Sequence, residues 1–161
     1  MILIDKFLRY ITSEKRYSQH TITAYRKDLQ QFLDFLTSEY NFSDPEKANF
    51  YQVREWIVSL IENKNKTSSV NRKISTLKTF FRFLLIEGII EENPLSKLIS
   101  PKNSKRLPIF VDKTSLNSIL DEKNFSDDFS GIRNRLIMEL FYATGMRLSE
   151  LINIKDIDID I

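Results

Sequence analysis

The sequence predicts a mainly α-helical protein: a bundle of helices followed by the beginning of a second domain. Glycine and proline, which interrupt helices, occur only 3 and 4 times in 161 residues. Long stretches place apolar residues three and four positions apart, which is the spacing of one helix face. Hydrophobic residues make up 42% and charged residues 29% of the chain, a composition typical of a globular protein.

Four helices are predicted in the first hundred residues, and a fifth, short helix is predicted over residues 95–99. The four begin and end near residues 4–14, 18–36, 50–62 and 68–87. Ser18 and Ser68 are suitable N-cap residues, and Gly88 stands where a C-terminal cap is expected.

Residues 101–108 form the best linker in the chain, because they are polar, basic and bounded by prolines. We therefore expect one domain over residues 1–100 and part of another over residues 109–161.

In the second region, Thr114 or Ser115 is expected to cap a short helix, and further helices are expected over residues 132–142 and 148–152. Residues 156–161 alternate strictly between aspartate and isoleucine, which predicts a half-buried strand that needs partner strands outside these residues.

The net charge of +2 is a weak argument for a nucleic-acid partner, but the distribution of charge says more. Residues 63–86 carry six cations and no acid, and residues 93–111 carry four cations and no acid. A local basic stripe on a nearly neutral protein suggests a face that binds polyanions. A solvated lysine-rich face is the alternative, and charge alone favours it.

The fourth predicted helix separates its apolar line, which includes Val70 and Leu84, from a basic stripe when projected at 100° per residue. The stripe comprises Asn71, Ser75, Lys78 and Arg82, with Arg72 further round the helix. Short hydrogen-bonding side chains beside cations suit the major groove of DNA. The second predicted helix carries a companion stripe formed by His20, Thr23, Lys27 and Gln31. This stripe is a weaker candidate, because the acids Asp28 and Asp34 flank it.

Several classes of site are excluded by residues that the sequence lacks. There is no cysteine, which excludes disulfides, thiolate zinc sites and cysteine nucleophiles and fits the cytoplasmic location that we expect. Glycine-rich nucleotide loops and the nucleophile elbow of hydrolases are missing as well. His20 is the single histidine and has no second ligand at useful spacing. The N-terminus shows no secretory leader pattern, and no apolar run approaches a membrane span.

The segment from Ala143 to Leu151 places Arg147 just past Gly145, at the start of a predicted helix. An arginine in this position can direct its guanidinium group at an anion beside a helix N-terminus. The sequence thus contains a candidate phosphate-binding arginine.

Three stretches together resemble tyrosine recombinases of the bacterial Xer type, also called phage-integrase-like proteins. They are residues 17–29, residues 71–94 and residues 144–151. The resemblance implies a four- or five-helix SAM-like core-binding domain that clamps duplex DNA, followed by the first helices and first strand of a truncated α+β catalytic domain. The cations Lys102, Lys105 and Arg106 of the linker, and Thr21 of the second helix, are added to the candidate DNA contacts on this basis.

The resemblance also implies a mechanism and partners. Arg147 would contact the scissile phosphate, and Glu150 would help to hold it. A tyrosine nucleophile would form a 3′-phosphotyrosyl link without metal or ATP. The family acts as a tetramer on paired sites, in chromosome dimer resolution or in integration, so a second recombinase protomer and a nucleoid-associated location are expected.

The sequence departs from the family's pattern in its catalytic groups. The family's lysine hairpin, His-x-x-Arg box and tyrosine nucleophile all lie downstream of the matching arginine, and none is found after Arg147 here. All six tyrosines precede Arg147. We therefore expect an N-terminal part of a recombinase that binds DNA without catalysing. Two alternatives stay open: an inactive DNA-binding accessory or regulator, and a helical protein-interaction domain.

Overall fold

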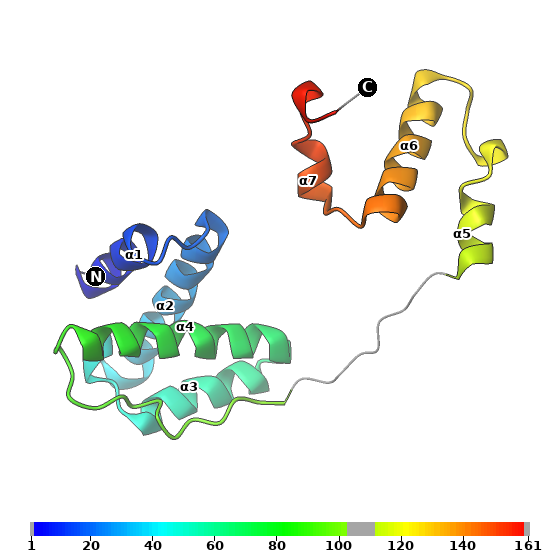
Figure 1. The fold of residues 1–161 in the computed structure, drawn as a ribbon. Coiled ribbons are helices and arrows are strands. Elements are labelled where there is room, and N and C mark those ends of the chain that lie inside the picture. The colour runs from blue at the N-terminus through cyan, green and yellow to red at the C-terminus, as the bar shows by residue number, and fades with distance from the viewer. Residues whose placement is uncertain (1, 103–111, 160–161) are drawn as a thin grey trace. The chain divides into compact units, whose positions relative to one another are not determined.

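The computed structural model describes residues 2–102 and 112–159 and is mainly α-helical (Figure 1). The chain divides into two compact units, Met1–Lys105 and Arg106–Ile161. Within the described residues, no helix combines the length and the apolar character needed to cross a bilayer. The first unit contains a packed core, and the second consists of short helices with little buried surface.

The first unit is built on α1 (Ile2–Ser13), α2 (Gln19–Tyr40), α3 (Phe50–Glu62) and α4 (Thr67–Ile86). The long helices α2 and α4 pack on each other, α1 packs on α2, and α3 packs on both α2 and α4 (Figure 1). A short 3₁₀ helix, η1 (Pro45–Lys47), connects α2 to α3 and packs against α2.

Aromatic rings fill the core where α1 meets α4. Phe7 is fully buried, and its ring lies edge-on to Phe80 at 5.3 Å and tilted to Phe83 at 5.5 Å between centroids. Trp56 of α3 lies 5.0 Å from the ring of Phe32 on α2. These residues occupy the apolar positions that recur every three or four residues, so the helices form because each can bury one stripe.

The helix ends are determined by local residues. Ser18 caps α2, since its Oγ accepts from the backbone N–H of Thr21 at 3.3 Å. Asn49 and Gln52 form a reciprocal capping box at the start of α3, with hydrogen bonds of 3.1 and 2.9 Å. Gly88 adopts φ 67° just after α4, a left-handed conformation that favours glycine. The helix α4 begins at Thr67, one residue before its predicted capping serine.

The predicted short helix over residues 95–99 is wrong. Residues 94–97 form turns, with hydrogen bonds from Ser96 N–H to the Asn93 carbonyl and from Leu98 N–H to the Leu95 carbonyl. Leu95 is nevertheless buried in the core of the first unit. Leu98 packs partly buried against the same core, so these two leucines anchor the segment without requiring a helix.

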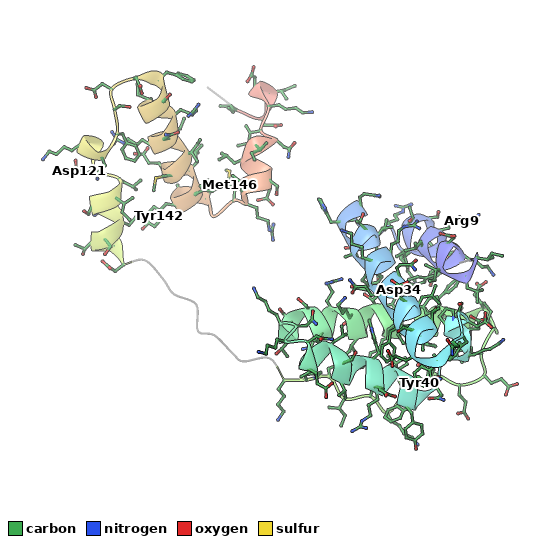
Figure 2. All side chains as sticks on the ribbon, turned by 180° about the vertical axis from the view of Figure 1, so that it is seen from behind. Arg9, Asp34, Tyr40, Asp121, Tyr142 and Met146 are labelled. Atoms are coloured by element: carbon green, nitrogen blue, oxygen red, sulfur yellow. The ribbon has the colours of Figure 1, made fainter. Side chains whose placement is uncertain are left out.

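The second unit contains α5 (Lys113–Ile119), η2 (Glu122–Asn124), α6 (Phe129–Thr144), α7 (Leu148–Ile152) and η3 (Asp156–Asp158). Asp112, and neither Thr114 nor Ser115, caps α5, because its carboxylate accepts from the Ser115 N–H at 2.9 Å. Gly145 ends α6 with φ 66°. Many apolar side chains of this unit are exposed, including Phe129 at 78% and Tyr142 at 61% (Figure 2).

The predicted strand over residues 156–161 is wrong for the residues that are described, because Asp156–Asp158 form a 3₁₀ turn. The carboxylate of Asp158 accepts from the Lys155 N–H at 3.0 Å, and the Asp158 N–H donates to the Lys155 carbonyl at 2.9 Å. No strand occurs in the described ranges, so this segment has no ladder to join and satisfies its backbone locally. Residues 160 and 161 lie outside the described part.

Substitution of Phe7 by alanine is expected to lower the free energy of unfolding of the first unit by about 3–5 kcal/mol, because it leaves a cavity among buried rings. Urea denaturation followed by Trp56 fluorescence measures this, since Trp56 is the single tryptophan and is 2% exposed. Tyr51→Ala is the control, because Tyr51 is 75% exposed. A Phe7→Ala midpoint equal to that of the control would contradict this packing.

Candidate nucleic-acid interface

The exposed side of α4 carries the cations of the predicted stripe. Ser75, Lys78 and Arg82 are exposed, and Asn71 is partly buried at the other end of the row. The apolar side of the same helix, from Val70 to Leu84, is buried against α2 and α3. We call the row Asn71, Ser75, Lys78 and Arg82 the α4 basic face. No acid occurs anywhere in α4, so its exposed cations have no neutralising partner within their own helix.

Asn71 has a structural partner that the sequence did not suggest. Its Nδ2 donates to the carbonyl of Pro101 at 2.9 Å, across 30 residues of sequence. This bond holds Pro101 against α4. It places the next residue, the exposed Lys102, beside the start of the α4 basic face. The Asn71 amide is therefore engaged within the protein. The other predicted linker cations, Lys105 and Arg106, lie outside the described residues.

Arg72 and Lys73 pair with a buried carboxylate of α2. Lys73 is buried, whereas the Arg72 side chain remains 44% exposed. The carboxylate of Asp28, which is 1% exposed, accepts from Arg72, from Lys73 at 3.2 Å and from the Thr76 hydroxyl at 2.9 Å. Lys73 is itself buried and also donates to Gln31. The acid-free run of α4 thus receives its counter-charge from another helix, and the candidate DNA contact Arg72 already has an acidic partner.

Asp28 was expected only to flank a polar stripe of α2, and its pairing with α4 was not predicted from the sequence. A signal was present: Asp28 lies three residues after Tyr25 and four before Phe32, in phase with the buried face of α2. A carboxylate in a core-facing position requires donors from a neighbouring helix, because an unpaired buried charge is strongly unfavourable.

Some of the predicted DNA contacts of α2 are exposed, and others form hydrogen bonds within the protein. His20, Thr23 and Lys27 are exposed, as an interface would require. Thr21 is half-buried and its hydroxyl lies 3.0 Å from the Ser18 hydroxyl at the helix cap. Gln31 accepts from Lys73 and so belongs to the Asp28 network.

Arg147 and Glu150 are brought together within one turn at the start of α7. The Glu150 carboxylate accepts from the Arg147 backbone N–H at 2.7 Å and from its Nη1 at 2.9 Å. These bonds, the backbone bond first, hold the pKa of Glu150 below its usual range. The Arg147 side chain is 81% exposed, so its guanidinium group is tethered at one edge and open to solvent elsewhere. In the described residues, no cluster of three or more acidic or histidine side chains forms a metal site.

These features coincide with a known family. Residues 4–88 match the phage integrase N-terminal SAM-like domain, and the chain belongs to that family. The resemblance to tyrosine recombinases is thereby confirmed.

Curated relatives and one solved structure extend the match along nearly the whole chain. Tyrosine recombinase XerC of Oceanobacillus iheyensis is 39% identical over 159 residues, covering 99% of this chain and 52% of that relative. XerC of Staphylococcus aureus is 40% identical over 159 residues, which cover 97% of this chain and 51% of that relative. This chain thus spans about half the length of these curated relatives. The Tn1549 transposon integrase, solved in complex with circular intermediate DNA, has the same fold with a TM-score of 0.66 at 20% identity, covering 98% of this chain and 50% of that one.

Substitution of Asp28 by alanine is expected to lower the free energy of unfolding by about 3–5 kcal/mol, because buried Lys73 would lose its counter-charge. Trp56 fluorescence in urea again measures the change. Asp34→Ala is the matched control, since Asp34 is exposed on the same helix, and its effect is expected to stay within about 0.5 kcal/mol. Equal effects of the two substitutions would contradict the importance of the network.

The pKa of Glu150 is expected to lie below the ordinary glutamate value of about 4.3, and Arg147→Ala is expected to raise it towards that value. Because the pKa is lowered in the folded state, the capping contribution is present above about pH 4.3 and is lost as pH falls through the lower value. NMR titration of the Glu150 side-chain carboxyl measures both midpoints. A wild-type midpoint at or above the ordinary value would disprove the tether.

Proposed function

We propose that this chain is the DNA-binding N-terminal part of a tyrosine recombinase and that it grips one half-site of duplex DNA. The observation that carries the proposal is the α4 basic face, where Lys78 and Arg82 are exposed while the neighbouring cations Arg72 and Lys73 are paired with Asp28. Cations that remain free after internal pairing are those available to phosphates and guanine edges.

The proposed organisation is a core-binding domain over residues 1–100, a basic linker over residues 101–108 and the start of a catalytic domain over residues 109–161. In the first domain, the exposed residues of α2, His20, Thr23 and Lys27, would contact DNA beside α4. In the linker, Lys102 would add a phosphate contact next to Asn71, and we extend the same role to Lys105 and Arg106. Thr21 would act through the helix cap rather than through a base.

In the second region, Arg147 would contact the scissile phosphate and Glu150 would orient it. Attack on a phosphodiester builds negative charge on the non-bridging oxygens, and a fixed guanidinium group stabilises that charge. The bond to Glu150 reduces the freedom of the long side chain and leaves its outer edge available. We propose further that the 161 residues alone bind DNA without cleaving it, since no tyrosine follows Arg147.

By analogy with the family, the full recombinase would act as a tetramer on paired sites, with a second recombinase protomer as partner. Its place of action would be the nucleoid, in chromosome dimer resolution or in integration. Mass photometry of the full-length recombinase mixed with duplex sites tests the assembly, and complexes that never exceed two protomers would argue against a tetramer.

Lys78→Ala and Arg82→Ala are each expected to weaken binding by about 1–3 kcal/mol, because each removes a direct contact to phosphate or base. The measurement is fluorescence anisotropy on a labelled duplex selected from a random-sequence library. Arg9→Ala is the control, as Arg9 is an exposed cation of α1 away from α4. Wild-type affinity that is insensitive to salt between about 50 and 200 mM would instead favour a protein-interaction domain.

Arg147→Ala is expected to leave half-site affinity nearly unchanged, because the proposed role of Arg147 lies in the transition state. A nicked suicide substrate tests the second part of the proposal, since a covalent protein–DNA adduct formed by the 161-residue chain would disprove its inactivity. Loss of equilibrium binding in Arg147→Ala would place this arginine in recognition rather than in catalysis.

A further inference from the structure

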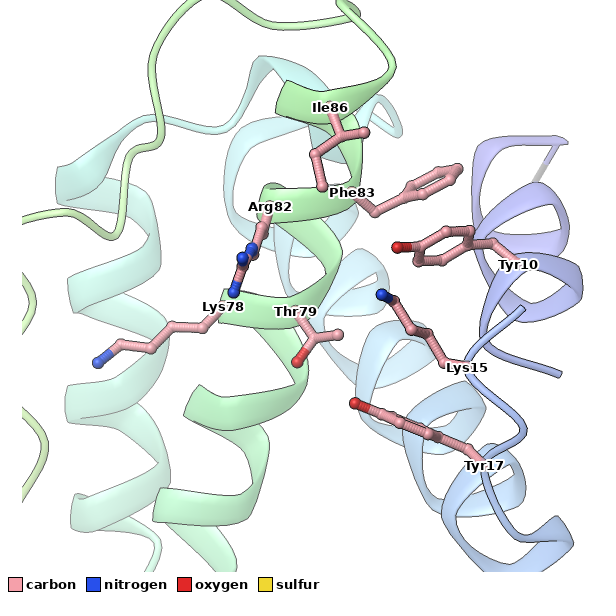
Figure 3. Close-up of a pocket in the computed structure, with 8 residues that line it drawn as sticks. All are labelled: Tyr10, Lys15, Tyr17, Lys78, Thr79, Arg82, Phe83 and Ile86. Atoms are coloured by element: carbon pink, nitrogen blue, oxygen red, sulfur yellow. The ribbon is translucent and has the colours of Figure 1, made fainter. Parts of the chain in front are cut away.

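A pocket of about 360 Å³ lies between α4 and the loop that joins α1 to α2 (Figure 3). Its lining contains three cations, two tyrosines, one threonine and two apolar residues: Lys15, Lys78, Arg82, Tyr10, Tyr17, Thr79, Phe83 and Ile86. No carboxylate lines this pocket among the described residues. The pocket therefore has the charge of an anion site, and only two of its eight lining residues, Lys78 and Arg82, are among the DNA contacts predicted from the sequence.

The loop side of the pocket is held in place by backbone and ring contacts. The Tyr17 N–H donates to the Ile11 carbonyl at 3.0 Å, and Arg16 adopts the left-handed conformation with φ 51° where the chain turns. The Tyr17 ring lies edge-on to Tyr25, with centroids 5.9 Å apart. The Tyr10 ring packs on Phe83 of α4 at 5.0 Å. The polar groups on these rings are thus positioned before any ligand arrives.

Three donor groups at the pocket, the Lys15 ammonium group and the hydroxyls of Tyr10 and Tyr17, have no acceptor among the described residues, whereas the Thr79 hydroxyl donates to the Ser75 carbonyl at 2.9 Å. Figure 3 shows the Lys15 ammonium group between the rings of Tyr10 and Tyr17, directed towards α4, with both tyrosine hydroxyls on the same side. Lys15 Nζ lies 5.6 Å from the centroid of the Tyr10 ring. The ammonium group of Lys15 and the two hydroxyls have no hydrogen bond or ion pair with another described residue, although the Lys15 backbone N–H donates to the Tyr10 carbonyl at 3.4 Å. An oxyanion would satisfy all three at once.

The pocket is continuous with the α4 basic face, because Lys78 and Arg82 belong to both. Their stems border the pocket, while the ammonium group of Lys78 extends away from it (Figure 3). A polyanion lying on the exposed side of α4 would therefore pass the mouth of the pocket. This shared boundary favours a phosphate of that same polyanion over a separate small molecule.

We propose that the pocket formed by Lys15, Tyr10 and Tyr17 against α4 binds one backbone phosphodiester of the DNA. This inference rests on the proposed function, and it adds a phosphate clamp from the α1–α2 loop to the contacts of α4. A phosphate held at a rigid point sets the register of the protein on the duplex, so that Lys78 and Arg82 meet defined positions in the groove.

The first test is the salt dependence of binding to the selected duplex. Lys15→Ala is expected to weaken binding about tenfold and to reduce the slope of log affinity against log salt by about one phosphate contact. Tyr17→Phe removes one hydroxyl and is expected to weaken binding several-fold. The matched controls are Arg9→Ala and Tyr51→Phe, which alter an exposed cation and an exposed phenol elsewhere. Trp56 fluorescence in urea verifies that each variant is folded.

The second test locates the phosphate by replacing single linkages of the duplex with neutral methylphosphonate. Wild-type protein is expected to lose about tenfold in affinity at one linkage where Lys15→Ala loses nothing further. If every methylphosphonate linkage lowered the affinities of the wild-type protein and of Lys15→Ala equally, the clamp would be overturned. Normal binding by Lys15→Ala together with weak binding by Lys78→Ala would overturn the clamp and leave the proposed function standing. Normal, salt-insensitive binding by all variants would overturn both.

Discussion

The buried carboxylate of Asp28 is the interaction on which the arrangement of the first unit depends. It accepts from three side chains of α4, and it lies almost without exposure between the two longest helices. Apolar stripes alone allow helices to slide or rotate by a turn at modest cost. A buried charge has a narrow set of acceptable partners, since each unpaired group is expensive in the interior. The network therefore selects one register of α2 on α4.

That register sorts the cations of α4 into two groups. Arg72 and Lys73 are turned towards Asp28, and Lys78 and Arg82, further along the helix, are left outside. The same packing brings the loop after α1 beside the second half of α4, where Lys15 and Tyr17 complete a pocket. A single buried pairing thus determines which positive charges stabilise the bundle and which remain available to a polyanion.

The second unit uses a different principle, because its candidate catalytic pair is built within one helical turn. Arg147 and Glu150 are joined through the backbone and the side chain, so the geometry depends on the start of α7 and not on a core. The glycine at the end of α6 allows the chain to reverse directly before this turn. A local device of this kind positions an arginine even though many apolar side chains around it are exposed.

The sequence by itself determined the main helices, two of their caps and the glycine-arginine turn, because these depend on residues within four positions of one another. The bounds of α3 and α7 and the caps at Ser18 and Gly88 follow this local logic. The strand predicted at Asp156 failed, since a strand needs hydrogen bonds from a neighbour that periodicity does not supply. Only the tertiary structure decided that Arg72 pairs inward, that Asn71 holds Pro101 and that Lys15 faces α4. Charge pairing depends on distance in space, and residues more than 40 positions apart become neighbours only when the helices pack.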